Sequence, residues 1–211
     1  MAVIDYCWTK SEEPIRISEF ATNLGFNLRT LEAEGVQEDK WDWINAKIRN
    51  SILAYLSDCW VEKRKSHLSS VTQGVYVITL SDNLSIDYGG NPSKVLYIGR
   101  GQIRTRLADH FKQWISYFTD SLQDISLDVW MTEIRVNGSK DAFKEVETDL
   151  LNHFYERFDC YPIQNTKAGD YHEKEHDYCG EWNKPLRNPT NINYGWSIKP
   201  LANNPWATGL E

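Results

Sequence analysis

The chain has 211 residues, of which 41% are hydrophobic and 13% aromatic, and its formal net charge is −7. This composition is typical of a globular protein with an ordinary core and excludes a disordered chain. The negative charge argues against tight nucleic-acid binding by overall charge, because phosphate neutralisation dominates such binding. Any contact with nucleic acid must therefore use a local basic segment.

No apolar run approaches the roughly 20 residues that span a bilayer. The first ten residues also lack the basic and apolar segments of a secretory signal. We therefore expect a soluble, cytoplasmic protein without membrane contact. The four cysteines form no CxxC pair, so we expect reduced thiols, as is usual in that compartment.

Residues 1–71 are expected to form a helical N-terminal region. Its main helix follows Gly35 and ends in the basic run 63–65, which suits the negative end of a helix dipole. Its apolar residues recur at intervals of three and four, as on one face of a helix: Trp41, Ile44, Ile48, Ile52, Leu53, Leu56 and Trp60. Residues 1–70 are a candidate for binding a protein partner or for self-association.

From Gly74 the pattern changes from helical to strand-like. Residues 74–80 and 94–99 are rich in β-branched and aromatic side chains, and a polar loop joins them. We expect these two strands to pair antiparallel. A helix over 103–118, a third strand over 127–136 and a helix over 141–158 follow.

This β-β-α-β-α order predicts an α/β fold with a small antiparallel three-stranded sheet flanked by helices. The domain is expected at residues 72–168. Residues 169–211 are rich in Tyr, Trp, Asn and Pro and show little periodicity. We expect an irregular C-terminal tail that packs on the domain.

Glu147 is the most informative polar residue of the last predicted helix. It falls near the middle of an apolar stripe, whereas Glu145 and Asp149 fall on the opposite face, where solvated carboxylates are expected. A carboxylate on a buried face is costly unless it is paired or binds a metal. Glu147 is therefore a candidate ligand for a divalent cation, and the alternative is an ion pair with an internal Arg or Lys.

Two further pairs of residues are candidates for a site. Arg106 and His110 lie four residues apart on a predicted helix and so share one face, with Arg104 as the rival arginine. Tyr76 and Tyr97 lie on strands expected to pair, so both phenols can face one spot. The alternative interpretation is that both are ordinary half-buried strand tyrosines.

These residues together resemble the GIY-YIG nuclease family over roughly residues 72–168. The first motif is Gly74-Val75-Tyr76 and the second is Tyr97-Ile98-Gly99; Arg106, His110, Glu147 and Asn165 follow in the family order. The resemblance implies a divalent-metal-dependent endonuclease that hydrolyses phosphodiester bonds in DNA, in a restriction, mobile-element or defence role. Glu147 would hold Mg²⁺ or Mn²⁺.

The resemblance also implies a role for each residue. Arg106 would pair with the charge that develops on the phosphate. Tyr76 would orient or deprotonate the attacking water, with Tyr97 or His110 assisting, and the choice of base between Tyr76 and His110 stays open. Asn165 would shape the site by hydrogen bonding.

The basic segment before and within the predicted helix supplies candidates for substrate binding, namely Arg100, Arg104 and Lys112. The stretch between Gly99 and Arg106 is about one residue shorter than in some branches of the family. This difference leaves the choice between Arg104 and Arg106 open.

Two alternatives accompany this interpretation. The chain could be a catalytically inactive nucleic-acid-binding or assembly module with the same fold, which its acidic charge allows. A second metal site for zinc would use four residues with an unusual spacing: Cys160, His172, His176 and Cys179.

Overall fold

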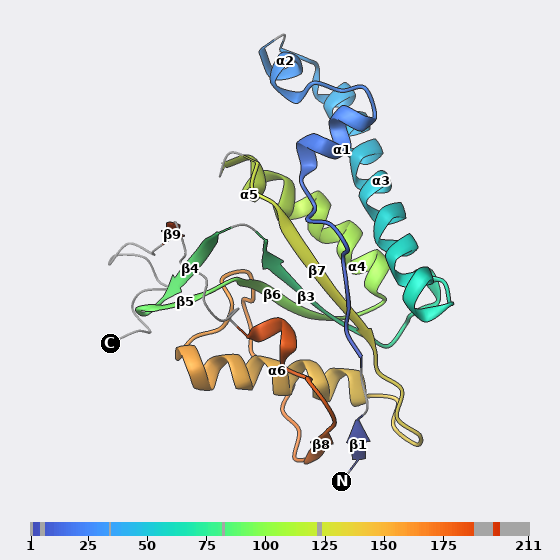
Figure 1. Cartoon of the computed structure of the whole chain (residues 1–211), viewed down its shortest axis with the longest axis vertical. Coiled ribbons are helices and arrows are strands. Elements are labelled where there is room, and N and C mark those ends of the chain that lie inside the picture. The colour runs from blue at the N-terminus through green and yellow to red at the C-terminus, as the bar shows by residue number, and fades with distance from the viewer. Residues whose placement is uncertain are drawn as a thin grey trace.

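The computed structural model of the protein describes residues 2–4, 7–33, 35–81, 83–121, 124–187 and 196–198. Within these ranges the chain forms both helices and strands (Figure 1). In chain order they are β1 (Ala2–Ile4), β2 (Thr9–Lys10), α1 (Ile17–Asn23), α2 (Leu28–Ala33), α3 (Glu38–Arg64), η1 (Leu68–Ser70), β3 (Gly74–Leu80), β4 (Leu84–Tyr88), β5 (Asn91–Ser93), β6 (Val95–Gly101), α4 (Ile103–His110), the π-helix η2 (Phe111–Ile115), α5 (Ser116–Ser121), β7 (Leu127–Glu133), α6 (Ala142–Phe158), β8 (His176–Tyr178), η3 (Lys184–Leu186) and β9 (Trp196–Ile198).

The central sheet has four antiparallel strands in the order β2-β7-β3-β6. The mixed α/β class is confirmed, and so is the antiparallel pairing of the two strands that carry the tyrosines. Every residue of β3 is buried, because this strand has neighbours on both edges and helices on both faces. The sequence predicted three strands, and that number is wrong, because β2 has only two residues and cannot show a strand period.

Short strands also make the two ends of the chain differ from the predicted structure. The N-terminal region is not wholly helical, because β1 pairs in parallel with β8, and the C-terminal tail is not wholly irregular. The predicted polar loop between the first two strands contains β4 and β5, which form a second sheet with β9. Each of these strands has five residues or fewer, which is too short for a clear strand period, and the β1–β8 and β4–β9 pairs join segments far apart in sequence.

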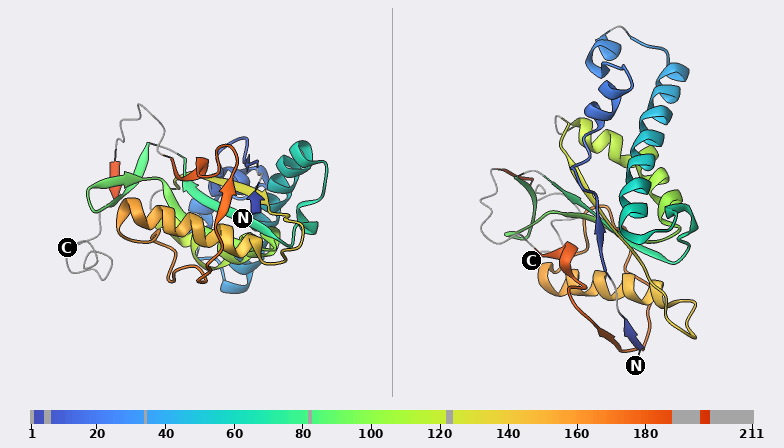
Figure 2. Two further views of the ribbon diagram at one scale, coloured as in Figure 1. Left: turned by 90° about the horizontal axis from the view of Figure 1, so that it is seen from below. Right: turned by 45° about the vertical axis from the view of Figure 1, so that its right-hand side comes forward.

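Helices cover the two faces of the central sheet. The helix α4 packs on the face that carries Gly74, whose missing side chain leaves room for Ile103: a Cβ at residue 74 would lie 2.3 Å from that side chain. The helix α6 contacts β6 and β3 from the other face (Figures 1 and 2). The strand β6 is an edge strand, so both helices approach it at the border of the sheet.

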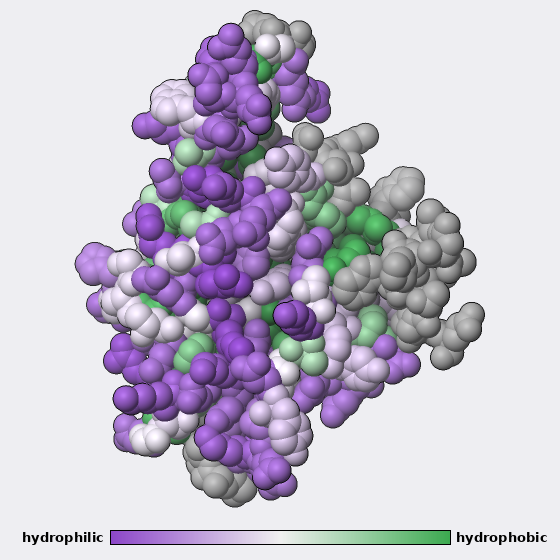
Figure 3. Space-filling model, turned by 180° about the vertical axis from the view of Figure 1, so that it is seen from behind, coloured by the Kyte–Doolittle hydropathy of each residue, from purple (hydrophilic) through white to green (hydrophobic). Residues whose placement is uncertain are grey.

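The long helix α3 matches the predicted one and ends at Arg64, where Lys65 caps it in a left-handed backbone conformation. The predicted helix over 103–118 is interrupted, since the π-helix η2 separates α4 from α5. The face seen from behind is largely hydrophilic (Figure 3). Among the residues that the structure describes, no helix combines the length and apolar character needed to cross a membrane.

Candidate active site

Tyr76 and Tyr97 lie on neighbouring strands of the central sheet, with their ring centroids 5.9 Å apart. Tyr76 is on the central strand and is fully buried, whereas Tyr97 is on the edge strand and is partly exposed. Burial raises the pKa of Tyr76 well above its usual value of 10, and Tyr97 adds to this effect while Arg106 opposes it. At neutral pH Tyr76 is therefore a phenol.

His110 connects these tyrosines to the helix α4. Its Nε2 atom lies 2.7 Å from the Tyr76 hydroxyl oxygen, and its ring centroid lies 4.3 Å from that of Tyr97. Burial lowers the pKa of His110 to about 4, and the charge of Arg106 lowers it further, against the opposing charge of Asp109. The imidazole is neutral at physiological pH, so its ring carries one proton.

Arg106 supplies positive charge next to both phenols. The negative charge that Tyr76 can carry raises the pKa of the Arg106 guanidinium above its usual value, and hydrogen bonds to Tyr97 and Tyr76 act in the same direction. Arg104 and Lys112 are exposed and lie outside the residues that line the cleft beside the tyrosines. Of the two rival arginines, Arg106 is therefore the one that lines the cleft.

The cleft has a volume of about 380 Å³ and lies along the edge strand β6. Side chains from four parts of the chain line it, including Tyr97, Arg100, Arg106, His110, Glu147 and Asn165. Tyr76 lies beneath this lining and reaches it through His110 and Tyr97. Five of the six predicted catalytic residues thus line one cleft, and the sixth contacts two of them.

Glu147 faces the cleft from the buried side of α6, as its place in the apolar stripe predicted. Burial raises the pKa of its carboxyl to about 7; Arg100 opposes this rise, Asp170 adds to it and Arg106 opposes it. At neutral pH the carboxyl is therefore divided between its protonated and ionised forms. A nearby cation would favour the ionised form.

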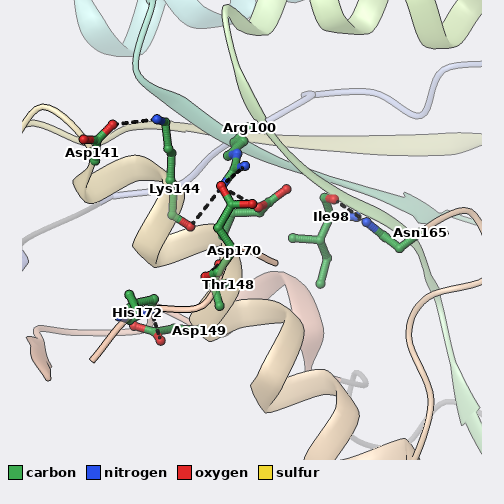
Figure 4. Close-up of polar contacts among 10 residues, drawn as sticks. Ile98, Arg100, Asp141, Lys144, Thr148, Asp149, Asn165, Asp170 and His172 are labelled. Atoms are coloured by element: carbon green, nitrogen blue, oxygen red, sulfur yellow. Dashed lines mark hydrogen bonds and ion pairs between the residues drawn. The ribbon is translucent and has the colours of Figure 1, made fainter. Parts of the chain in front are cut away.

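The cation present beside Glu147 is the guanidinium of Arg100. Its Nη1 atom lies 3.2 Å from Glu147 Oε2, and its Nη2 atom donates to Asp170 Oδ2 at 2.6 Å (Figure 4). The internal ion pair expected as the alternative for Glu147 is therefore present. Both partners line the cleft, and the Arg100 side chain is 25% exposed, so the pair lies at the cleft wall.

This arrangement changes the interpretation of Arg100. The sequence predicted that its charge would be available to a phosphate, but two carboxylates already bind its guanidinium. Lys167 is an exposed basic residue that lines the same cleft, and it is better placed for a phosphate contact. The sequence analysis missed it because it lies in a loop without any pattern.

Asn165 holds the edge strand in place. Its Oδ1 atom accepts a hydrogen bond from the Ile98 backbone N–H at 2.9 Å, and its Nδ2 donates to the Ile98 carbonyl at 2.7 Å (Figure 4). The side chain thus pairs with the free edge of β6 as a neighbouring strand would. Asn165 therefore holds the segment that carries Tyr97 and Gly99.

Two further residues of the site were missed as functional candidates. The indole of Trp114 donates a hydrogen bond from Nε1 to His110 Nδ1 at 2.9 Å. Trp114 has the spacing of an apolar helix face with Leu107 and Phe111, and the π-helix that contains it leaves no signal in the sequence. Asp170 lies in the segment predicted to be an irregular tail, and its contact with Arg100 depends on the tertiary fold.

The predicted zinc ligands do not come together. His172 lies 3.0 Å from Asp149, and His176 lies 3.0 Å from Glu145, so both histidines face carboxylates of α6. Within the described parts of the chain, no group of three or more His, Cys, Asp or Glu side chains has an arrangement suited to a metal ion. The expectation that Glu145 is solvated is wrong, because the segment with Lys174 and His176 covers that face of the helix.

No protein-family model, curated protein or solved structure matches the chain. The assignment of a function therefore depends on the motifs of the sequence and on the geometry of the cleft.

Proposed function

We propose that the protein is a divalent-metal-dependent endonuclease of the GIY-YIG kind that hydrolyses phosphodiester bonds in DNA. The main support is the convergence of Tyr97, Arg106, His110 and Glu147 on one cleft, with Tyr76 beneath it. These five residues come from four separate elements, and their order along the chain is the order of the family motifs. Chance placement of ordinary strand tyrosines does not account for the nearby arginine, histidine and carboxylate.

The carboxylates of the cleft fit a hard divalent cation. Mg²⁺ is commonly held by one or two carboxylates, while water and substrate phosphates complete its ligands. Glu147 and Asp170 both face the Arg100 guanidinium, which shows that this place favours positive charge. A bound divalent ion would supply Lewis-acid stabilisation of the charge on the scissile phosphate.

The other residues act on the phosphate and on the attacking water. Arg106 is half exposed at the cleft and its planar guanidinium matches phosphate oxygens. The phenols of Tyr76 and Tyr97, beside Arg106, orient the water, and the phenolate form of either would accept its proton. Burial holds the pKa of Tyr76 above its usual 10 although Arg106 lowers it, so formation of that phenolate requires the added positive charge that a bound divalent ion would supply.

The competing function is a nucleic-acid-binding or assembly module without turnover. One observation favours it: the ion pair between Arg100 and Glu147, which engages the carboxylate that would bind the metal. In this alternative, DNA binding persists in EDTA and no substrate is cut. A role for residues 1–70 in partner binding or self-association is a separate proposal.

The test is cleavage by the purified full chain of supercoiled, linear duplex and branched DNA, and of RNA, with Mg²⁺ or Mn²⁺. We expect DNA cleavage that stops in EDTA and falls by at least about 100-fold in Glu147→Gln. The matched control is Glu156→Gln, an exposed glutamate of the same helix, which should cleave normally. Absence of cleavage by the unaltered protein, or full activity in Glu147→Gln, contradicts the proposal.

A further inference from the structure

Both ring nitrogens of His110 are engaged in hydrogen bonds within the protein. Nδ1 lies 2.9 Å from the indole Nε1 of Trp114, and Nε2 lies 2.7 Å from the hydroxyl oxygen of Tyr76. An indole N–H can only donate, so Nδ1 must be the acceptor and carries no proton. A neutral imidazole has one proton, so that proton is on Nε2 and is donated to the oxygen of Tyr76.

We infer that Trp114 fixes the tautomer of His110, so that His110 donates a hydrogen bond to Tyr76 and cannot serve as the base that accepts a proton from the attacking water. The tautomer follows from the geometry alone, and its catalytic meaning depends on the proposed nuclease function. Trp114 is in this view a positioning residue, because it acts through His110.

The alternative arrangements of the proton are excluded by the same contacts. If the Tyr76 hydroxyl donated to Nε2, neither nitrogen would carry a proton, and the ring would be an imidazolate. If the ring were protonated on both nitrogens, the Nδ1–H group would face the indole N–H of Trp114, and two donors would meet without an acceptor. Protonation is also opposed by the burial of His110, whose residue surface is only 5% exposed.

The local backbone supports a specific placement of Trp114. The π-helix η2 begins directly after His110 and contains Trp114, and the Ser116 hydroxyl donates to the Phe111 carbonyl five residues earlier at 2.8 Å. Because a π-turn is wider than an α-helical turn, residues that are four positions apart differ in their angle about the helix axis from such residues in a regular α-helix. Such π-turns inside α-helices are frequent at functional sites.

The role of His110 follows from this tautomer. The oxygen of Tyr76 receives the Nε2 proton of His110 as a hydrogen bond, and Arg106 lies beside it. Donors that face an oxygen favour its negatively charged form. Of the residues considered as the base, Tyr76 and Tyr97 are then left, since Nδ1 of the imidazole accepts from Trp114 and Nε2 already carries a proton.

The direct test is NMR of the full chain labelled with ¹⁵N. Long-range ¹H–¹⁵N spectra separate protonated from unprotonated ring nitrogens, and His110→Gln identifies the signals of His110 among the five histidines. We expect a single tautomer at pH 7 with the proton on Nε2, and a ¹⁵N–¹⁵N coupling between Trp114 Nε1 and His110 Nδ1. A proton on Nδ1, or no coupling, overturns the inference.

Trp114→Phe removes the indole N–H and keeps an aromatic ring. We expect it to replace the single tautomer by a mixture and to lower kcat by about tenfold or more, with KM within about twofold. The control is Trp43→Phe, a 53% exposed tryptophan on α3, which should change neither property. An unchanged tautomer in Trp114→Phe, or a lost tautomer with unchanged kcat, overturns the inference.

The NMR result and the cleavage result separate the two proposals. If the unaltered protein cuts no nucleic acid but His110 has the stated tautomer, the nuclease proposal fails and the assignment of the proton stands. If the protein cuts DNA and Nδ1 carries the proton, the nuclease proposal stands and Trp114 has no such role.

Discussion

Gly99 lies opposite Tyr76 in the ladder between β3 and β6, and its missing side chain makes room for the phenol. A Cβ at residue 99 would lie 2.6 Å from the Tyr76 hydroxyl oxygen and 2.4 Å from a ring carbon of Tyr97. Real Cβ contacts essentially never fall below 3.0 Å, so a larger residue would displace one of the two rings. Gly99, the last glycine of the second motif, is therefore required because the two phenol rings occupy the space of a side chain. Its backbone conformation does not itself demand glycine.

Gly99→Ala is expected to destabilise the fold and to disturb the site together. Overpacking of a close contact costs about 1–3 kcal/mol in the free energy of unfolding, which urea titration measures. Cleavage should fall as well, because at least one of the two phenols is displaced.

The double variant Gly99→Ala/Tyr97→Ala provides the control for this clash. Since it removes the nearest ring, its destabilisation should be smaller than the sum of the two single effects. Additive effects, or a Gly99→Ala protein as stable and active as the unaltered chain, would show that the close approach is unimportant.

Local patterns in the sequence were sufficient for the strands that carry the tyrosines and for the burial of Glu147. The β-branched run of β3 and the apolar stripe of α6 are properties of neighbouring residues, and they determine which side chains face inward. Glu147 could be singled out because it is a charged residue at a position on the apolar face of its helix. The identity of the divalent ion and the substrate are proposals that these patterns do not test.

Contacts between distant segments could not be predicted in the same way. The burial of Glu145 depends on residues 172–178 crossing the far face of α6, and the pairing of Arg100 depends on Asp170, 70 residues later. The hydrogen bond between Trp114 and His110 depends on a π-turn, whereas helix-wheel reasoning assumes a regular period. Each of these is set by tertiary packing, which local propensity does not encode.

Asn165→Asp is expected to weaken the edge of the sheet. The substitution keeps the acceptor for the Ile98 N–H, but it replaces the donor to the Ile98 carbonyl by a negatively charged oxygen. A buried carbonyl without its donor costs about 1–3 kcal/mol, and repulsion between the two oxygens adds to this cost. Denaturant titration should show the loss, and kcat should fall because β6 carries Tyr97.

The neighbouring Gln164 supplies the control. Its backbone N–H donates to the Leu96 carbonyl at 3.0 Å, and this bond survives in Gln164→Ala. A stability of Gln164→Ala close to that of the unaltered protein is expected. Equal losses in the two variants would mean that the Asn165 amide has no special role at the strand edge.

The raised pKa of Glu147 predicts a specific dependence of stability on pH in EDTA. Burial lifts the pKa from its usual 4.5 to about 7, so between these values the folded protein binds this proton more tightly than the unfolded chain. The stabilising contribution is fully present below pH 4.5 and is lost as the pH rises through 7. The change amounts to about 3 kcal/mol at most.

Comparison of variants isolates this contribution from other titrating groups. The free energy of unfolding of Glu147→Gln, relative to the unaltered protein, should rise between pH 4.5 and 8. Glu156→Gln, at an exposed position, should give a constant difference over the same range. A constant difference for Glu147→Gln as well would show that the carboxyl titrates as an ordinary exposed glutamate.

Removal of Arg100 is expected to strengthen metal binding. Its guanidinium, 3.2 Å from Glu147 Oε2, is a cation on the carboxylate that would hold the divalent ion, so the two compete. Arg100→Gln should therefore bind Mn²⁺ about tenfold more tightly, a difference of about 1.4 kcal/mol, measured by calorimetry at pH 8.

Arg104→Gln, which removes an exposed arginine outside the cleft, is the matched control and should leave the affinity unchanged. Adding Glu147→Gln to Arg100→Gln should abolish the binding. Weaker or equal Mn²⁺ binding in Arg100→Gln would mean that the guanidinium does not occupy the cation position, and binding that survives without Glu147 would place the metal elsewhere.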